Sequence, residues 1–214
     1  MSEIKAVIFD VDGTLLDTRE FIQHAFEHTL ERHRFAVPEK AVLLEILRSG
    51  APLHSCYEIF APGGDILSLR ETHGKFQKDH LELAMAYDGL IELLQLLKSR
   101  GIRLAACSSR GGTVRTSLRR AQALPYFEIV LDANDVVHHK PDPEGILKIL
   151  ESMNIEPVHA AMIGDTRADI EAGKNAGVLM TIGVTHGFGL RETLEDAGAD
   201  HVVDSLQDVP TLLM

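Results

Sequence analysis

The chain has 214 residues, 45% of them hydrophobic, and carries a formal net charge of −11. This length fits one domain of ordinary size, or a core domain with a smaller insert, and the hydrophobic content is enough to form a core. The acidic balance argues against a protein that binds nucleic acid, because contacts with phosphate backbones need clustered Lys and Arg.

Two cysteines, Cys56 and Cys107, lie far apart in the sequence. They offer neither a disulfide framework nor the spacing of a zinc site. The apolar run near the N-terminus, residues 6–9, is too short for a signal peptide, and no segment approaches the ~20 apolar residues of a membrane span. We therefore expect a cytoplasmic protein whose partners include no membrane and no nucleic acid; its oligomeric state stays open.

Strands and helices are predicted to alternate along most of the chain. Short apolar runs closed by turn residues predict strands at 5–11, 102–107, 128–133, 160–165, 178–184 and 201–204. Apolar residues at helical spacing predict helices at 90–101, 142–154, 167–177, 190–197 and 205–213. Asp88 and Asp142 are the expected N-caps of the first two of these helices. The alternation predicts an α/β fold with a Rossmann-like parallel sheet flanked by helices.

Residues 17–86 interrupt this alternation. They contain helical stretches at 19–33, 39–50 and roughly 67–85, and no convincing strand. We predict an inserted α-helical domain at 17–86, with 1–16 and 87–214 forming the α/β core. Asp17, followed three residues later by Glu20, is expected to cap the first helix of the insert.

Polar residues follow four of the predicted strands. Their positions are Asp10 and Asp12, Ser108 and Ser109, Lys140, and Asp165 and Asp169. The carboxyl ends of parallel strands share one edge of a sheet, which is where ligands bind in open α/β folds. We therefore expect these residues to converge there.

The converging residues have a shared chemistry. Three nearby carboxylates, those of Asp10, Asp12 and Asp165, would raise one another's pKa unless a cation lay between them. Mg²⁺ prefers oxygen ligands and often shares them with phosphate. Lys140 can offset negative charge, and the Ser108 hydroxyl can bind phosphate oxygens.

The segment DVDGTLLD at 10–17, a strand ending in Ser, a Lys before Pro and GDTRADI at 164–170 together resemble the haloacid dehalogenase-like hydrolase superfamily. The resemblance spans residues 6–170 and is to the phosphoglycolate phosphatase-like and β-phosphoglucomutase-like branch. It implies that the inserted helical domain is a cap over the active site, with hinges near 16–18 and 86–89.

The resemblance also implies roles for individual residues. Asp10 would attack phosphorus and form an aspartyl-phosphate, and Asp12 would act as general acid and then as general base. Ser108 and Lys140 would bind the phosphoryl group and offset its charge. Dehalogenase members lack an acid two residues after the nucleophile, so Asp12 favours phosphoryl transfer.

The implied metal is Mg²⁺, bound by Asp10, the main-chain carbonyl of Asp12, and Asp165. Asp169 would contribute directly, through water, or by orienting the site. A second interpretation of Asp169 is open, because Thr166-x-x-Asp169 fits a capping box at a helix N-terminus. Both roles can hold together.

The substrate is expected to be a small phosphorylated metabolite. Residues 48–53, Arg-Ser-Gly-Ala-Pro-Leu, resemble a cap loop of phosphoglycolate phosphatase-like members, which makes phosphoglycolate the leading candidate. Arg48 and His54 are candidate contacts to the substrate. Two alternatives remain, a phosphosugar mutase of the β-phosphoglucomutase type and a binding or regulatory protein that has lost catalysis on the same fold.

Overall fold

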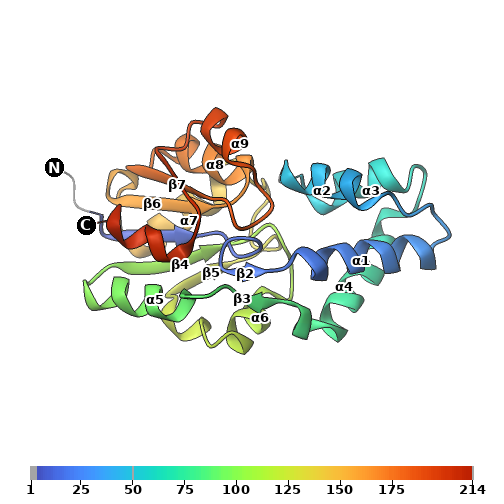
Figure 1. Cartoon of the computed structure of the whole chain (residues 1–214), viewed down its shortest axis with the longest axis horizontal. Helices are drawn as coiled ribbons and strands as arrows, with labels where there is room; N and C mark the ends of the chain where they lie inside the picture. The colour runs from blue at the N-terminus through green and yellow to red at the C-terminus, as the bar shows by residue number, and fades with distance from the viewer. Residues whose placement is uncertain (1–3, 50, 214) are drawn as a thin grey trace.

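The computed structural model describes residues 4–49 and 51–213 and has two lobes (Figure 1). The larger lobe contains a six-stranded parallel sheet in the order β5-β4-β1-β6-β7-β8. Its strands are β1 Ala6–Phe9, β4 Arg103–Cys107, β5 Ile129–Leu131, β6 Ala160–Gly164, β7 Met180–Val184 and β8 His201–Val203. Helices flank the sheet, so the predicted α/β fold class is confirmed.

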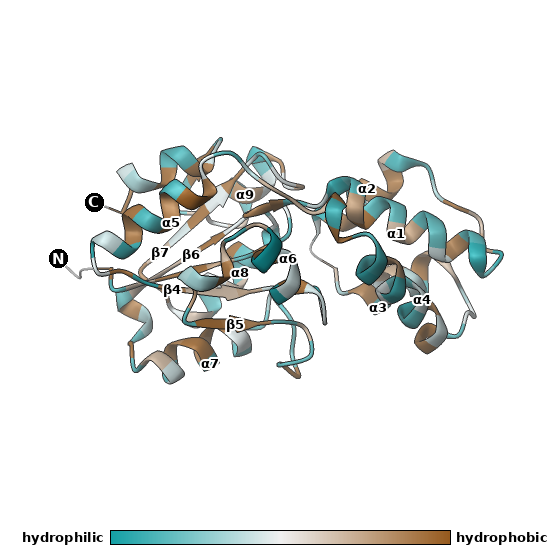
Figure 2. Ribbon diagram, turned by 90° about the horizontal axis from the view of Figure 1, so that it is seen from below, coloured by the Kyte–Doolittle hydropathy of each residue, from teal (hydrophilic) through white to brown (hydrophobic). Residues whose placement is uncertain are grey.

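Both faces of the sheet are buried. On one face Val7 and Phe9 pack with α5 Leu90–Ser99, α6 Val114–Arg120 and the 3₁₀ helix Leu206–Thr211. On the other face Ala6 and Ile8 pack with α7 Glu144–Met153 and α8 Arg167–Ala176. A strand covered on both faces carries apolar side chains at every position, which explains its unbroken apolar sequence. Figure 2 shows the strands mainly brown, the hydrophobic end of the scale.

The smaller lobe, which we call the helical lobe, consists of α1 Arg19–Arg32, α2 Lys40–Arg48, α3 Leu53–Phe60 and α4 Ile66–Asp79. It has its own apolar cluster, built around Phe26, Tyr57 and Leu69. A short antiparallel ribbon joins it to the sheet, with Leu16–Asp17 (β2) paired to Met85–Ala86 (β3). The four helices lie within the segment predicted as an insert, and the ribbon lies at that segment's two ends.

Several element ends differ from the prediction. Asp17 lies in β2 and binds Arg19, while Thr18 is the N-cap residue of α1. Gly89, whose φ is 80°, precedes α5 in place of Asp88. Pro143 is the N-cap residue of α7, although the Asp142 carboxylate still accepts a hydrogen bond from the Glu144 N–H at 2.9 Å.

The expected helices at 67–85 and 205–213 are also shorter than predicted. The first ends at Asp79 and is followed by a 3₁₀ turn, Leu81–Leu83 (η1), and by β3. The second is a 3₁₀ helix over 206–211 that contains Pro210, which lacks the N–H donor of an α-helix. Within the described residues, no helix combines the length and the apolar character needed to cross a membrane.

Candidate active site

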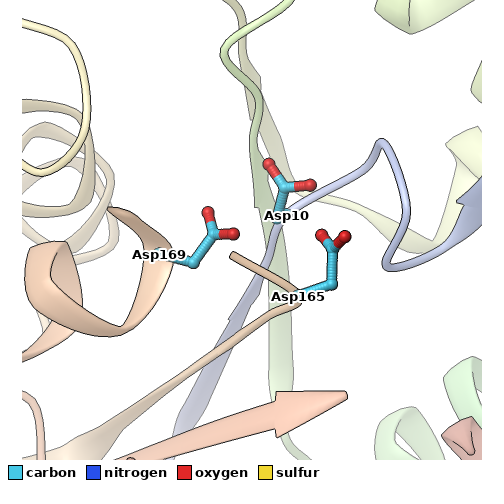
Figure 3. Close-up of side chains that lie close together, drawn as sticks. All are labelled: Asp10, Asp165 and Asp169. Carbon is cyan, nitrogen blue, oxygen red and sulfur yellow. The ribbon is translucent and has the colours of Figure 1, made fainter. Parts of the chain in front are cut away.

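Three carboxylates meet at the carboxyl edge of the sheet (Figure 3). Asp10 follows β1, Asp165 follows β6, and Asp169 lies in the first turn of α8. The two strands are neighbours in register, and the Asp10 N–H donates to the Ile163 carbonyl at 2.8 Å. One oxygen from each of the three carboxylates lies within 4.8 Å of the others.

Lys140 neutralises part of this charge. Its Nζ donates to Asp10 Oδ1 at 2.5 Å, to Asp169 Oδ1 at 2.5 Å and to the Cys107 carbonyl at 3.0 Å. Lys140, Asp10 and Asp169 are all buried. A buried ammonium needs such partners, and these carboxylates raise the pKa of Lys140 well above its usual value although burial opposes them.

Asp165 and Asp169 are held by further donors. Asp165 accepts from the Thr14 hydroxyl at 2.9 Å and from the Phe188 N–H at 2.7 Å. Asp169 Oδ2 accepts from the N–H and hydroxyl of Thr166, at 2.9 and 2.6 Å, which completes a capping box. Asp169 therefore caps α8 and also belongs to the carboxylate cluster.

The cluster carries more negative charge than its one lysine can balance. Burial raises the pKa of Asp10 well above its ordinary value. Burial, followed by the nearby Asp169, raises the pKa of Asp165 to about 7. Oxygen ligands that are buried, mutually repelling and close together fit a hard divalent cation such as Mg²⁺, which would relieve this repulsion.

The Asp12 carboxylate lies outside this cluster. It accepts from Arg110 Nε at 3.1 and 2.9 Å and from the Ser108 hydroxyl at 3.2 Å. Ser108 therefore contacts Asp12, as well as accepting from the Arg110 N–H at 3.1 Å. The predicted metal ligand is the main-chain carbonyl of Asp12, so its side chain is available for the predicted acid–base role.

Arg110 was not predicted as a site residue. Besides Asp12, it donates through Nη1 to the Thr113 and Ser117 hydroxyls at 2.7 and 3.0 Å. Its guanidinium carbon lies 5.2 Å from the centre of the Phe21 ring. The only signal in the sequence is a lone cation two residues after Ser108, the serine that follows β4.

Gly13 and Thr14 were also not assigned to the site. Gly13 has a φ of +84°, and a Cβ there would lie 2.2 Å from Asp165 Oδ2. Glycine therefore lets the turn after β1 approach Asp165 closely. The available signal in the sequence is the Gly-Thr pair directly after Asp12.

A cavity of about 690 Å³ lies between the two lobes. Asp10, Asp12, Lys140 and Asp169 line it from the core, and Ser109 lies beside them. From the helical lobe the wall includes residues 51–53 of the predicted cap loop and the candidate His54; Gly50 of that loop lies outside the described residues.

Arg48 does not line this cavity. Its Nε donates to the Phe188 carbonyl at 3.1 Å, and the Phe188 N–H binds Asp165. Arg48 therefore connects the helical lobe to the loop that holds Asp165. The candidate contact of Arg48 with substrate stays a prediction.

The chain is similar to known proteins over most of its length. A family model described as haloacid dehalogenase-like hydrolase matches residues 7–183. The chain is 30% identical over 213 residues to the pyrophosphatase PpaX of Bacillus mycoides (strain KBAB4), covering 99% of this chain and 97% of that protein.

Solved structures are similar over almost the whole chain. One is a Clostridium acetobutylicum protein described as a predicted phosphatase, with a TM-score of 0.86, 29% identity and 99% coverage of both chains. Another is a Thermotoga maritima protein assigned as a β-phosphoglucomutase, with a TM-score of 0.75 and 28% identity, covering 99% of this chain and 100% of that one.

Proposed function

Because this chain belongs to the haloacid dehalogenase-like hydrolases, we propose that it is a Mg²⁺-dependent phosphatase that acts on a small phosphorylated metabolite through an aspartyl-phosphate. The observation that carries the proposal is the buried cluster of Asp10, Asp165 and Asp169 around Lys140, with Asp12 beside it. The cavity between the lobes gives this cluster access to a substrate.

Asp10 is the proposed nucleophile. Its Oδ1 is bound to Lys140, and no described residue donates to Oδ2, which is the oxygen we expect to attack phosphorus. The new Oδ2–P bond forms as the bond between phosphorus and the leaving oxygen breaks. Lys140 limits the charge that builds up on the transferring group.

Asp12 is the proposed proton carrier. In the first step its protonated form gives a proton to the leaving oxygen, and in the second the resulting carboxylate takes a proton from the water that attacks the aspartyl-phosphate. This second attack breaks the bond to Asp10 and releases inorganic phosphate. Arg110 and Ser108 orient the Asp12 carboxylate for both steps.

Asp10, Asp165 and the main-chain carbonyl of Asp12 would hold Mg²⁺, with Asp169 beside them. When bound, the ion neutralises charge on the carboxylates and on the phosphoryl oxygens. Thr14 and the Phe188 N–H keep Asp165 in place, and Thr166 keeps Asp169 in place.

Phosphoglycolate, favoured by the resemblance of residues 48–53, is the first substrate to assay. Pyrophosphate is the second, because the curated relatives are named pyrophosphatases. A phosphosugar mutase is the alternative function, supported by Asp12 and by the similarity to the Thermotoga maritima protein. Release of inorganic phosphate distinguishes a phosphatase from a mutase, which converts a sugar 1-phosphate to its 6-phosphate.

The direct test is Asp10→Asn, assayed with p-nitrophenyl phosphate and Mg²⁺. We expect the variant to keep the far-UV circular dichroism of the wild type and to lose hydrolysis. Asp196→Asn is the matched control, because Asp196 is exposed at the end of α9 and should leave activity unchanged. Wild-type turnover in Asp10→Asn would remove Asp10 as the nucleophile, and an inactive wild type would favour the binding or regulatory alternative.

A further inference from the structure

One face of α4 borders the cavity opposite the carboxylates. Arg70, His73, Gly74 and Gln77 all line it, at the i, i+3, i+4 and i+7 spacing that places residues on one side of a helix. His73 and Gln77 are only 2% and 5% exposed. Buried polar groups normally have hydrogen-bond partners, so each of these two side chains needs an explanation.

Gln77 has no side-chain hydrogen bond to any residue between 4 and 49 or 51 and 213. The fully enclosed side-chain atoms that lack a partner in this part of the chain are Thr18 Oγ1 and Arg110 Nη2. The Gln77 amide is not among these enclosed atoms, so part of it is accessible to solvent. Because Gln77 lines the cavity, the accessible part faces that space. Its N–H₂ and its carbonyl are thus free to bind a molecule there.

His73 presents one ring nitrogen to the same cavity. Its Nδ1 lies 2.7 Å from the Tyr57 hydroxyl, and the Phe26 ring packs edge-on against it with centres 5.0 Å apart. Tyr57 is fully buried, and Thr29 is a second hydrogen-bond neighbour of its hydroxyl. When the Tyr57 O–H donates to Nδ1, the proton of the neutral ring is on Nε2, and this is the tautomer that offers a donor to the cavity.

Charged residues of the helical lobe line other parts of the cavity. Arg70, Glu71, Lys75, Lys78 and Asp79 also line it, but all five are exposed and their charges are mixed. On the core side, Lys140 is bound by Asp10 and Asp169, and Arg110 is bound by Asp12. Among the buried cations of this wall in the described residues, only Arg110 Nη2 lacks a partner, and that atom is enclosed by protein.

Apolar side chains also line the cavity, and the space is large. Ile22, Phe26, Leu47 and Leu53 line it from the helical lobe. A volume of about 690 Å³ is within the range of pockets that bind drug-sized ligands.

We propose that His73 and Gln77 bind the leaving group of the substrate. This group is a neutral organic moiety of the size of a ring, and it bears hydroxyl or carbonyl oxygens. His73 Nε2–H donates to one such oxygen, and the Gln77 amide binds another. The apolar wall packs against the carbon skeleton. Tyr57 is a positioning residue, because its hydroxyl holds the His73 ring at Nδ1. This inference rests on the proposed phosphatase activity and narrows its substrate class.

The test compares kcat/KM with Mg²⁺ for glucose 6-phosphate, uridine 5′-monophosphate, phenyl phosphate, phosphoglycolate and pyrophosphate. Glucose 6-phosphate and uridine 5′-monophosphate are the two ring esters that carry polar oxygens on the ring. We expect kcat/KM for one of these two ring esters to exceed kcat/KM for both phosphoglycolate and pyrophosphate by tenfold or more. Two neutral hydrogen bonds correspond to roughly 30-fold in kcat/KM, or about 2 kcal/mol. A preference for phosphoglycolate or pyrophosphate would overturn the inference.

Variants locate the effect. In Gln77→Leu and in His73→Phe we expect the ratio of kcat/KM for the preferred ring ester to that for phenyl phosphate to fall about tenfold. Tyr57→Phe should lower the same ratio by a smaller factor. Gln23→Leu and His28→Phe, on α1 and outside the cavity wall, are the matched controls and should keep the ratio. Gln77→Met replaces Gln77→Leu if the latter misfolds. An unchanged ratio in both cavity variants contradicts the assignment.

Binding to Asp10→Asn separates this inference from the phosphatase proposal. Calorimetric titration of the two ring esters into this variant needs no turnover. If no substrate is hydrolysed by the wild type but Gln77→Leu weakens binding about tenfold, the phosphatase proposal fails and the recognition site stands. If turnover is normal but substitutions of Gln77 and His73 leave the binding affinity unchanged, the proposed recognition site is wrong and the phosphatase proposal stands.

Discussion

Arg110 Nε donates to both carboxylate oxygens of Asp12, at 3.1 and 2.9 Å, and the two side chains are only 5% and 12% exposed. The pair joins the loop after β4 to the turn after β1. Arg110 is held from behind by Thr113 and Ser117, so it presents Asp12 in one orientation. A proton carrier in the proposed reaction is thus positioned by a residue that itself has no chemical role.

Replacing Arg110 by Met should therefore cost both stability and activity. Removing one partner of a buried ion pair leaves an uncompensated charge and typically costs about 3–5 kcal/mol in unfolding free energy. Arg110→Lys should lose less, because it keeps a charge but not the bonds to Thr113 and Ser117. Urea unfolding and kcat for p-nitrophenyl phosphate measure the two effects.

A double variant separates stability from catalysis. Arg110→Met with Asp12→Asn removes the unpaired charge, so we expect most of the stability to return while activity stays lost. Arg19→Met is the matched control, because the Arg19–Asp17 pair is exposed and should contribute about 0–1 kcal/mol. Equal losses of unfolding free energy in Arg110→Met and Arg19→Met would show that the Arg110–Asp12 pair stabilises the fold no more than an exposed pair does.

Gly13→Ala tests the close approach at the metal site. A left-handed backbone costs an L-residue roughly 1–2 kcal/mol, and the new Cβ would also collide with the Asp165 carboxylate. Gly177 has a similar φ of +73° at the end of α8 but no atom within 4 Å of a Cβ. Gly177→Ala therefore carries the backbone cost alone.

We expect Gly13→Ala to lower the midpoint of urea unfolding more than Gly177→Ala does, and to abolish hydrolysis. Gly177→Ala should retain activity. If both variants were equally stable and equally active, Asp165 would have room to move, and the close packing would not matter for the site.

Much of the α/β core was predictable because its signals are local. Ala6–Phe9 is apolar at every position, as a strand buried on both faces must be, and the structure places all four residues at 0% exposure. The motifs that follow β1 and β6 fall at the same edge because the sheet is parallel. Helix α3 was not predicted, since it begins at the end of the segment 48–53 that was interpreted as a cap loop and its other residues were left unassigned.

Arg110, His73 and Gln77 could not have been predicted from the sequence in the same way. Nothing near Arg110 in sequence shows that its partner is Asp12, 98 residues away. The polar residues His73 and Gln77 share a helix face with Arg70, which by pattern alone is a solvent-exposed face. Their burial depends on how the helical lobe sits over the sheet, and this is a tertiary property.

Mg²⁺ should stabilise the folded chain measurably. A ligand that binds only the folded state adds about 2.7 kcal/mol at 100 times its Kd, which corresponds to a rise in Tm of about 5–10 °C for a chain of this size. We expect Asp165→Asn to lose this shift and Asp204→Asn, at an exposed site beside Arg191, to keep it. Excess EDTA should also stop turnover; full activity in EDTA would contradict the metal role.

The last prediction concerns the protonation of His73. Burial lowers the pKa of His73 to about 3, while in the unfolded chain it stays near 6.5. Between these two values the unfolded state binds a proton that the folded state does not. The stability that neutral His73 allows is thus fully present above pH 6.5 and is lost as pH falls toward 3.

His73→Phe removes this dependence, so the two proteins should diverge in acid. Relative to His73→Phe, the wild type should lose about 1.4 kcal/mol of unfolding free energy per pH unit below pH 6.5, or about 2.7 kcal/mol by pH 4.5. Urea unfolding at pH 7, 5.5 and 4.5, with EDTA in every sample, makes the comparison and keeps the carboxylate cluster the same in both proteins. The exposed His28→Phe is the control and should follow the wild type. Parallel curves for wild type and His73→Phe would mean that His73 takes up a proton in the folded state as readily as in the unfolded one, and the neutral state of the buried His73 ring would have to be abandoned.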